Sequence, residues 1–202
     1  GAALTLFLNT SLTYSRIHSV NKVFDTEKQR DTDALTGIQN DISYFRKVDE
    51  ISKSIQAGAK ELRFAIVLLD INDLKSMNDT YGHLAGDEVI KRIASVTAKH
   101  MEENDGFICR YGGEEFVVVL PNKNLSEAEP IIKALFDKLC EQVVTYNANE
   151  IKLSVSVGLT AYPEVCSDTD ELLKRADWCM YYAKEHGRHQ LKLDDGKIEK
   201  QN

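Results

Sequence analysis

Residues 107–120 read FICRYGGEEFVVVL, two apolar runs joined by a short acidic turn. Because the turn is short, the two runs predict a pair of strands that form a β-hairpin. Gly112 and Gly113 allow positive φ and would let another molecule approach the backbone closely. Glu114 and Glu115 place two carboxylates at the tip of this hairpin.

A second apolar run covers residues 64–69 and ends in Asp70. Such an uninterrupted run predicts a strand that is buried on both faces of a sheet. If this strand lies beside the hairpin, Asp70, Glu114 and Glu115 converge, which is unfavourable unless a cation neutralises them. Mg²⁺ fits, because it prefers oxygen ligands and is shared between one or two carboxylates and substrate phosphates. The alternative is a solvated acidic turn without a metal.

The polar segment 72–79 follows directly after the strand. A turn at this place can offer successive backbone N–H groups to phosphate, and Lys75 would add a positive charge. The side-chain oxygens of Asn78 and Asp87 can accept the N–H donors that guanine presents. Taken singly, each of these residues is also typical of a solvated loop or a helix cap.

The segment 184–188 ends a predicted helix. Lys184 lies in the last turn, where the helix dipole favours a cation, and Gly187 suits the position that stops a helix. These residues are therefore explained by a well-formed helix end. They would equally form a cationic clamp on terminal phosphates, since Arg188 can bind a phosphate through two parallel hydrogen bonds.

Apolar periodicity predicts further elements around these segments. We expect helices over 42–55, 86–101, 126–141 and 168–184, a second hairpin from strands 142–146 and 151–160, and a last strand over 190–193. The predicted fold class is α/β, with a mixed, largely antiparallel central sheet flanked by helices. A thin apolar stripe over 4–30 predicts an N-terminal helix, which pairs with a partner helix in a dimer or packs on the domain.

The bulk composition describes an acidic globular protein. The chain has 202 residues, 43% of them hydrophobic and 28% charged, with a net charge of -7. Such a charge disfavours non-specific binding to nucleic acid and to anionic lipid. The four cysteines have no metal-site spacing, and we expect them to be reduced thiols in a cytoplasmic domain. The sequence suggests a piece of a longer protein, with room for an upstream sensor or membrane anchor.

Four blocks of residues now form a recognisable set. In order they are 33–40 (DALTGIQN), 70–75 with 78–83 and 86–88, 110–116 (RYGGEEF), and 176–177 with 182–184 and 187–188. With these blocks the chain resembles the GGDEF family of diguanylate cyclases, in the GGEEF form of the signature. The resemblance covers about residues 31–195. It implies a fold similar to nucleotidyl cyclases and the polymerase palm, a linker or signalling helix over 1–30 that can support dimerisation, and a tail over 196–202.

The resemblance also implies a metal site. Asp70, the carbonyl of Ile71 and Glu114 would hold Mg²⁺, for which Mn²⁺ can substitute, and Glu115 would be a ligand for a second metal. Glu114 would accept the proton of the ribose 3′-hydroxyl, and Lys75 would stabilise charge during transfer. Whether the site takes one metal or two is left open.

The substrate site follows from the same resemblance. GTP would be bound by the backbone amides of Asn72, Asp73 and Leu74 at its phosphates and by Asn78 and Asp87 at guanine. His83 would lie near the base, Gly112 and Gly113 beside the nucleotide, and Lys184 and Arg188 at the outer phosphates.

The implied reaction joins two GTP molecules into cyclic di-GMP and releases pyrophosphate. The 3′-hydroxyl of one GTP attacks the α-phosphate of the other, in line with the leaving group. Each domain binds one GTP, so turnover requires a homodimer.

Some positions depart from the family pattern. Asn72 and Leu74 replace a frequent Asp and Phe, and Asp41 stands where the entry block usually has Arg. The family's RxxD inhibition motif would fall at residues 103–106, which read ENDG. We therefore expect no product inhibition through that site.

Three alternatives remain. The first is a degenerate GGDEF module that senses GTP or cyclic di-GMP without turnover. The second is a cyclase that makes cyclic GMP–AMP, which Asp87 disfavours because a carboxylate would face the N1 lone pair of adenine. The third is an interaction protein in which the acidic turn is only structural.

Overall fold

The computed structural model describes residues 30–58 and 62–197 of the chain. The chain divides into two units, residues 1–32 and 33–202, and the fold is that of the second unit. The N-terminal helix expected over 4–30 lies outside the described residues, apart from Arg30. Most of the expected tail, from residue 198 onward, lies outside them as well.

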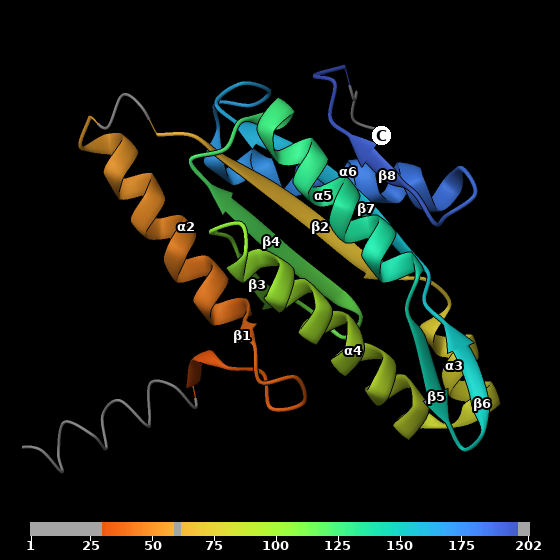
Figure 1. Cartoon of the computed structure of the whole chain (residues 1–202). Coiled ribbons are helices and arrows are strands. Elements are labelled where there is room, and N and C mark those ends of the chain that lie inside the picture. Colours follow the sequence, from red (N-terminus) through yellow and green to blue (C-terminus); the bar gives the residue numbers. More distant parts are fainter. Residues whose placement is uncertain (1–29, 59–61, 198–202) are drawn as a thin grey trace, which may run out of the picture. The chain divides into compact units, whose positions relative to one another are not determined.

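The centre of the fold is a six-stranded sheet (Figure 1). Its strand order is β1 (Gln39–Asn40), β3 (Phe107–Arg110), β4 (Glu115–Pro121), β2 (Phe64–Ile71), β7 (Val155–Tyr162) and β8 (Leu191–Leu193). Only the outer pairs β1–β3 and β7–β8 are parallel, and the three inner pairs are antiparallel. The predicted mixed, largely antiparallel sheet is confirmed, and so is the hairpin of β3 and β4.

Strand β2 lies in the middle because it is apolar on both faces. All eight of its residues are buried. Alternate side chains of a strand point to opposite faces, so Phe64, Ile66 and Leu68 share one face while Ala65, Val67 and Leu69 share the other. The same alternation puts Asp70 on the face of Phe64, at the end of an otherwise apolar row.

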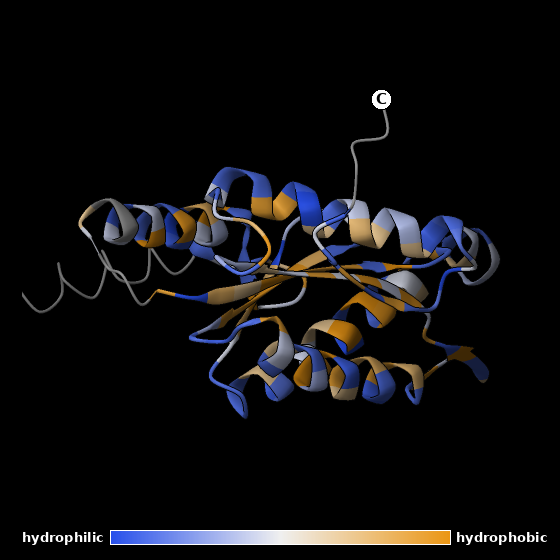
Figure 2. Ribbon diagram, turned by 90° about the horizontal axis from the view of Figure 1, so that it is seen from above, coloured by the Kyte–Doolittle hydropathy of each residue, from blue (hydrophilic) through white to orange (hydrophobic). Residues whose placement is uncertain are grey.

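Helices cover both faces of the sheet, as Figure 2 shows edge-on. Helices α4 (His83–Glu102) and α5 (Leu125–Cys140) contribute to the larger core, together with Val67 and Leu69. Helices α2 (Asp41–Gln56) and α6 (Thr169–Glu185) contribute to the second core, together with Ile66 and Leu68. Among the described residues, no helix combines the length and the hydropathy that a bilayer crossing needs.

Helix α6 packs closely on β7. A Cβ atom at Gly158 would lie 2.0 Å from the carbonyl oxygen of Ala176, so only glycine allows this approach. Asp168 caps the start of the helix, accepting a hydrogen bond from the Asp170 amide. At the other end Gly187 has a φ of 108°, and the Arg188 N–H donates to the Ala183 carbonyl. The predicted stop of this helix at Gly187 is confirmed.

The segment after β2 differs from the expected loop. Residues Leu74–Tyr81 form a helix, α3, and α4 already begins at His83 instead of Gly86. Gly82, with a φ of 88°, makes the corner between the two helices. Short polar helices of this kind carry little apolar periodicity, and packing against a neighbouring helix stabilises them.

The second hairpin also differs from the prediction. Strands β5 (Val143–Tyr146) and β6 (Asn149–Lys152) form a separate two-stranded sheet, closed by Asn147 and Ala148 with positive φ. The expected strand over 151–160 is therefore two strands. It breaks at Ser154, whose carbonyl accepts the Asn72 N–H. Beyond the break β7 joins the main sheet beside β2.

Candidate active site

The site begins where β2 ends. Asp70 is paired with Glu115 of β4 in the antiparallel register, so both side chains leave the same face of the sheet. Asp70 is only 2% exposed, and its Oδ2 lies 2.8 Å from Nζ of Lys184 on α6. Its Oδ1 is buried and has no hydrogen-bond partner among the described residues. One carboxylate oxygen is thus available to a ligand.

The carboxylates of the site repel one another. Burial raises the pKa of Asp70, although the ammonium group of Lys184 acts in the opposite direction. Burial also raises the pKa of Glu114, and the charge of Asp70 raises it further. The pKa of Glu115 is raised by burial and by the charges of Asp70 and Asp177. Such a cluster favours a proton or a cation.

The signature turn is tied to its neighbours by the backbone. The N–H groups of Tyr111 and Gly112 donate to the Glu115 carbonyl, and the Ile71 N–H donates to the Glu114 carbonyl at 3.2 Å. Neither Gly112 nor Gly113 has positive φ, so the conformational reason expected for these glycines is wrong. The space beside Gly113 is open, and a Cβ there would meet no atom within 4 Å. Close approach by another molecule remains the explanation for Gly113.

The side chain of Arg110 links this turn to the entry block by hydrogen bonds. Its Nη1 donates to both carboxylate oxygens of Asp33, each at 3.1 Å, and its Nη2 donates to the Gly113 carbonyl at 2.7 Å. Burial would raise the pKa of Asp33, but hydrogen bonds from Thr36 and Arg110 outweigh it and hold that pKa below its usual range. From the sequence alone, Asp33 and Arg110 are members of two motif blocks and have no predicted role. The structure links the entry block to the signature through them.

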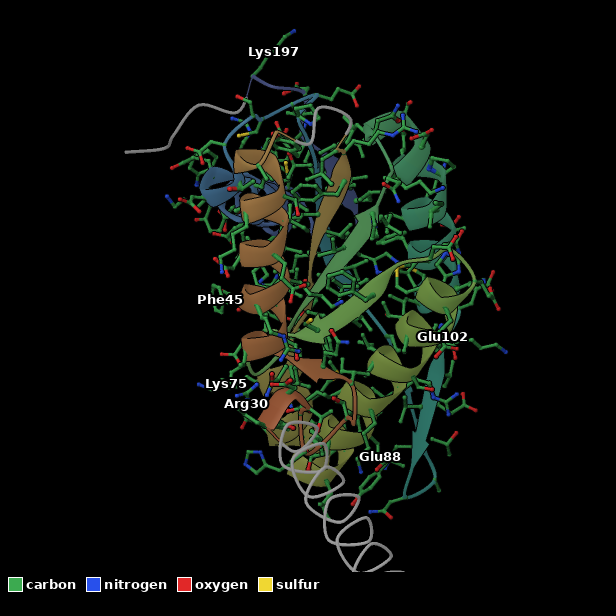
Figure 3. All side chains as sticks on the ribbon, turned by 90° about the vertical axis from the view of Figure 1, so that its left-hand side faces the viewer. Arg30, Phe45, Lys75, Glu88, Glu102 and Lys197 are labelled. Carbon is green, nitrogen blue, oxygen red and sulfur yellow. The ribbon has the colours of Figure 1, made fainter. Side chains whose placement is uncertain are left out.

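A pocket of about 200 Å³ opens beside Asp70. It is lined by Asp70, Ile71, Asn72, Asp73, Leu74, Lys75, Glu114, Lys184 and Arg188. Nine of the residues expected to bind metal or phosphate are therefore gathered in one place, from both halves of the chain. Lys184 pairs with Asp70, Arg188 pairs with Asp73, and Lys75 points outward from α3 (Figure 3).

The loop at the pocket floor corrects one expected contact. The backbone N–H of Asn72 donates to the Ser154 carbonyl at 2.9 Å, so it is not free to bind a phosphate. Asp73 has a left-handed φ of 59° and occupies the N-cap position of helix α3, without a side-chain capping hydrogen bond. The first turn of a helix leaves N–H groups without intrahelical partners. The backbone N–H groups that remain to bind phosphate, called the backbone cradle below, are therefore those of Asp73, Leu74 and the residues that follow in α3.

The residues expected to read guanine lie on α3 and α4, outside the lining of this pocket. Asn78 packs against Gly86, where a Cβ atom would come within 2.0 Å of the Asn78 Oδ1. This Oδ1 is buried and unpaired among the described residues, so it can accept a donor from a base. Asp87 follows Gly86, and His83 lies one helical turn before Asp87 on the exposed side.

The residues present fit a magnesium ion. Among the described residues, no three His, Cys, Asp or Glu side chains are arranged to hold a metal ion together. Mg²⁺ does not need such a cage, since it usually takes one or two carboxylates and completes its shell with water and phosphate. The unpaired Oδ1 of Asp70, with Glu114 nearby, offers that donor set.

Comparison with known proteins identifies the family. The sequence model of the diguanylate cyclase GGDEF domain matches residues 30–190.

The chain belongs to the GGDEF family.

Curated relatives of this GGDEF domain include named cyclases. It is 31% identical over 170 residues to diguanylate cyclase A of Treponema denticola, covering 84% of the chain and 46% of that relative. It is 33% identical over 170 residues to diguanylate cyclase DgcP of Pseudomonas aeruginosa, covering 84% of the chain and 25% of that relative. Over 160 residues it is 34% identical to response regulator PleD of Caulobacter vibrioides, covering 78% and 35%. The chain thus spans less than half the length of these relatives.

Solved structures confirm the fold of the GGDEF domain. The coiled coil and GGDEF domain of DgcB from Caulobacter crescentus, in complex with cyclic di-GMP, match with a TM-score of 0.80 at 22% identity. That match covers 93% of this chain and 98% of the other. Diguanylate cyclase SiaD of Pseudomonas aeruginosa, in complex with its activator SiaC, matches with a TM-score of 0.72 at 27% identity, covering 94% and 76%.

Proposed function

We propose that this GGDEF domain is a diguanylate cyclase that condenses two GTP molecules into cyclic di-GMP with release of pyrophosphate. One observation carries the proposal: the pocket beside Asp70 combines carboxylates for a metal with Lys75, Lys184 and Arg188 for a triphosphate. An acidic protein needs such a local set of cations to bind a polyanion. The named cyclases among its relatives support the same activity.

Asp70, the Ile71 carbonyl and Glu114 would hold Mg²⁺ or, in its place, Mn²⁺. When bound, the metal supplies Lewis-acid stabilisation of charge on the phosphates. Glu115 is paired with Asp70 in the sheet and is the candidate ligand for a second metal ion. Each of these carboxylates has a raised pKa in the ligand-free protein, and a bound cation would lower it.

The phosphates would lie between α3 and the end of α6. The amides of Asp73 and Leu74 would donate to the phosphate oxygens, and the α3 dipole favours their negative charge. Lys75 would stabilise charge that develops during transfer, and Lys184 and Arg188 would hold the outer phosphates. To do so, Arg188 exchanges Asp73 for phosphate, a stronger bidentate partner.

Guanine would lie against α3 and α4. Asn78 and Asp87 would accept its N–H donors, His83 would flank the base, and Gly112 and Gly113 would leave room for the nucleotide at the turn. A site built to pair with these donors rejects adenine, because its carboxylate would then face a lone pair. We therefore expect GTP to be preferred over ATP, and this preference to weaken in Asp87→Ser.

Glu114 would accept the proton of the attacking 3′-hydroxyl. The attacked α-phosphate belongs to the GTP of a second domain, so a homodimer is the working unit. Residues 1–30 are the candidate linker helix that brings two domains together, and an upstream sensor or membrane anchor would act through it.

The deciding experiment is product analysis after incubation with GTP and Mg²⁺ over a range of protein concentrations. We expect cyclic di-GMP and pyrophosphate, with specific activity that rises with concentration. GTP binding without pyrophosphate release would instead show a non-catalytic sensor, the alternative function. A Glu114→Ala variant that keeps both its fold and full turnover would likewise contradict the proposal.

Product inhibition offers a separate test. Glu103 stands where the inhibition motif would have its arginine, and it lies 3.6 Å from Nζ of Lys138 on α5. An acidic residue at this place repels the phosphates of cyclic di-GMP. We expect added cyclic di-GMP to leave the initial rate unchanged at concentrations that saturate an RxxD cyclase assayed in parallel. Inhibition that Glu103→Ala alters would contradict this expectation.

A further inference from the structure

Asn72 is a buried polar residue in the lining of the phosphate pocket. It follows β2 and is only 3% exposed. Its backbone N–H is engaged by Ser154, so the residue does not bind phosphate through that group. A buried side-chain amide is expected to satisfy both its oxygen and its nitrogen. The partners of this amide therefore indicate what Asn72 does.

The amide has one orientation that satisfies all of its neighbours. With the oxygen towards Ser154, it accepts from Ser154 Oγ at 2.9 Å, the Val155 N–H at 3.3 Å and the His189 N–H at 3.2 Å. The nitrogen then donates to Ser156 Oγ at 2.8 Å. In the opposite orientation the nitrogen would face two backbone N–H donors, which is unfavourable in a buried place.

These contacts join three separate segments of the chain. Asn72 belongs to the loop before α3, Val155 begins β7, and His189 follows the end of α6. His189 strengthens the junction, because its Nδ1 lies 3.2 Å from Ser154 Oγ. The junction therefore connects the start of the α3 backbone cradle to the segment that carries Arg188.

The segment with Arg188 needs such support. Arg188 and His189 have φ values of 57° and 46°, so two successive residues with side chains adopt the left-handed region. Residues other than glycine rarely do so unless the surrounding structure holds them there. The hydrogen bond from the His189 N–H to Asn72 is one of the contacts that fix this backbone.

We propose that Asn72 is a positioning residue of the phosphate site, which fixes Arg188 relative to the backbone of Asp73 and Leu74. The inference rests on the proposed function, since it assumes that these groups bind the phosphates of GTP. Because its amide is bonded within the protein, we expect the Asn72 side chain to act through these segments and not by contact with the nucleotide.

The test compares two nucleotides in the Asn72→Ala variant. GTP and GMP share the base and ribose, but only GTP has the outer phosphates that Arg188 would hold. Binding of each is measured by calorimetry in Mg²⁺, with both nucleotides in the 3′-deoxy form, which lacks the attacking hydroxyl and so cannot react. We expect the affinity for GTP to fall about ten- to a hundredfold, as misplacement of a binding group commonly does, while the affinity for GMP stays unchanged.

Two variants control the comparison. Asn72→Asp keeps the oxygen that accepts from His189, and the Ser156 hydroxyl can turn to donate, so GTP affinity should return close to that of the wild type. Asn104→Ala removes another amide, which donates to the His100 carbonyl at 2.8 Å, away from the phosphate pocket. It should leave the ratio of GTP to GMP affinity unchanged. Asn72→Ser replaces Asn72→Ala in the comparison if the alanine variant is unstable. A serine is too short to reach His189, so it should show the same loss of GTP affinity.

Equal losses for GTP and GMP in both Asn72→Ala and Asn72→Ser, or no loss in either, would overturn the positioning role. Such results leave the proposed function standing. Conversely, a wild-type protein that binds GTP more tightly than GMP but releases no pyrophosphate would overturn the proposed function and not the role of Asn72.

Discussion

Asp70 is costly to the folded protein and useful to its chemistry. Because burial raises its pKa above that of the unfolded chain, ionising it in the folded state is unfavourable. Its contribution to stability is therefore most favourable below the unfolded pKa and is lost as the pH rises through that pKa and the higher folded one. Burial therefore favours the neutral form of Asp70, while the metal needs the charged form.

Replacing Asp70 should separate these two effects. We expect Asp70→Asn to lose turnover, because the proposed metal ligand is gone. We also expect it to raise the melting temperature of the ligand-free protein at pH 7, because a charge that is unfavourably buried is removed. Thermal unfolding at pH 7 and at pH 3 checks this, since the difference from wild type should shrink at the lower pH. A variant that melts below the wild type at pH 7 would show that the charged Asp70 carboxylate does not destabilise the folded protein.

Arg110 acts on the signature turn through geometry and not through charge alone. A lysine at this position cannot bind Asp33 and the Gly113 carbonyl together. We expect Arg110→Lys to lower kcat about ten- to a hundredfold, with a smaller change in KM for GTP, because Glu114 is then misplaced. Steady-state kinetics at saturating Mg²⁺ measures both constants.

Arg175 provides the matched control. It forms a similar two-bond pair with the buried Asp194, at 2.6 and 2.7 Å, but on the side of α6 and β8. Arg175→Lys should reduce stability and leave kcat close to the wild type. If both lysine variants lower kcat equally, the effect of Arg110 is general destabilisation and not positioning of the turn.

At the scale of residues, the sequence predicts the carboxylate cluster well. An apolar run that ends in an acid, beside a hairpin with an acidic tip, brings Asp70 opposite Glu115 through the strand register, with Glu114 next to it in the turn. It could not predict that the Asn72 N–H is bonded to Ser154, because that contact depends on where β7 begins. The pairing of Asp33 with Arg110 joins segments far apart in the chain, and only their place in known motifs singled them out.

At the scale of elements, strands were easier to predict than the segments around α3. The continuous apolar character of β2 leaves it no place but the centre of a sheet. Helix α3 is short and polar, and its contact with α4 through Gly86 cannot be read from periodicity. The division of residues 151–160 into two strands depends on hydrogen bonds made at Ser154 and was missed for the same reason.

The contact between α3 and α4 can be tested at Gly86. A methyl group there would lie 2.0 Å from Asn78 Oδ1, so Gly86→Ala must displace the side chain expected to read guanine. We expect KM for GTP to rise about tenfold or more and the preference for GTP over ATP to decrease. Competition between the two nucleotides measures the preference.

Gly113→Ala is the contrasting variant, because a Cβ there meets no atom within 4 Å in the ligand-free protein. It should fold as stably as the wild type.

Unchanged base preference in Gly86→Ala, in a protein that still binds GTP, would show that Asn78 does not read the base.

At the scale of the whole molecule, one domain holds only half of the proposed reaction. Mixing wild-type chains with an equal amount of Asp70→Asn chains should leave about a quarter of the pairs fully competent, if pairing is random. We therefore expect cyclic di-GMP production per wild-type chain to fall to about one half in the mixture at fixed total protein concentration. Mixed pairs should form one bond and release a linear dinucleotide, which chromatography resolves. No loss of activity in the mixture would show that one chain suffices.

The phosphate site depends on the last described helix as much as on the signature. Both pocket cations that pair with Asp70 and Asp73 come from residues 184–188. During synthesis, the signature turn leaves the ribosome long before residues 184–188 are added. A nascent chain would therefore contain the full signature but lack two of the cations proposed to bind the triphosphate. A chain that ends before α6 would still match the motif in a sequence search, but it would lack the cations proposed to hold the triphosphate and should not make cyclic di-GMP.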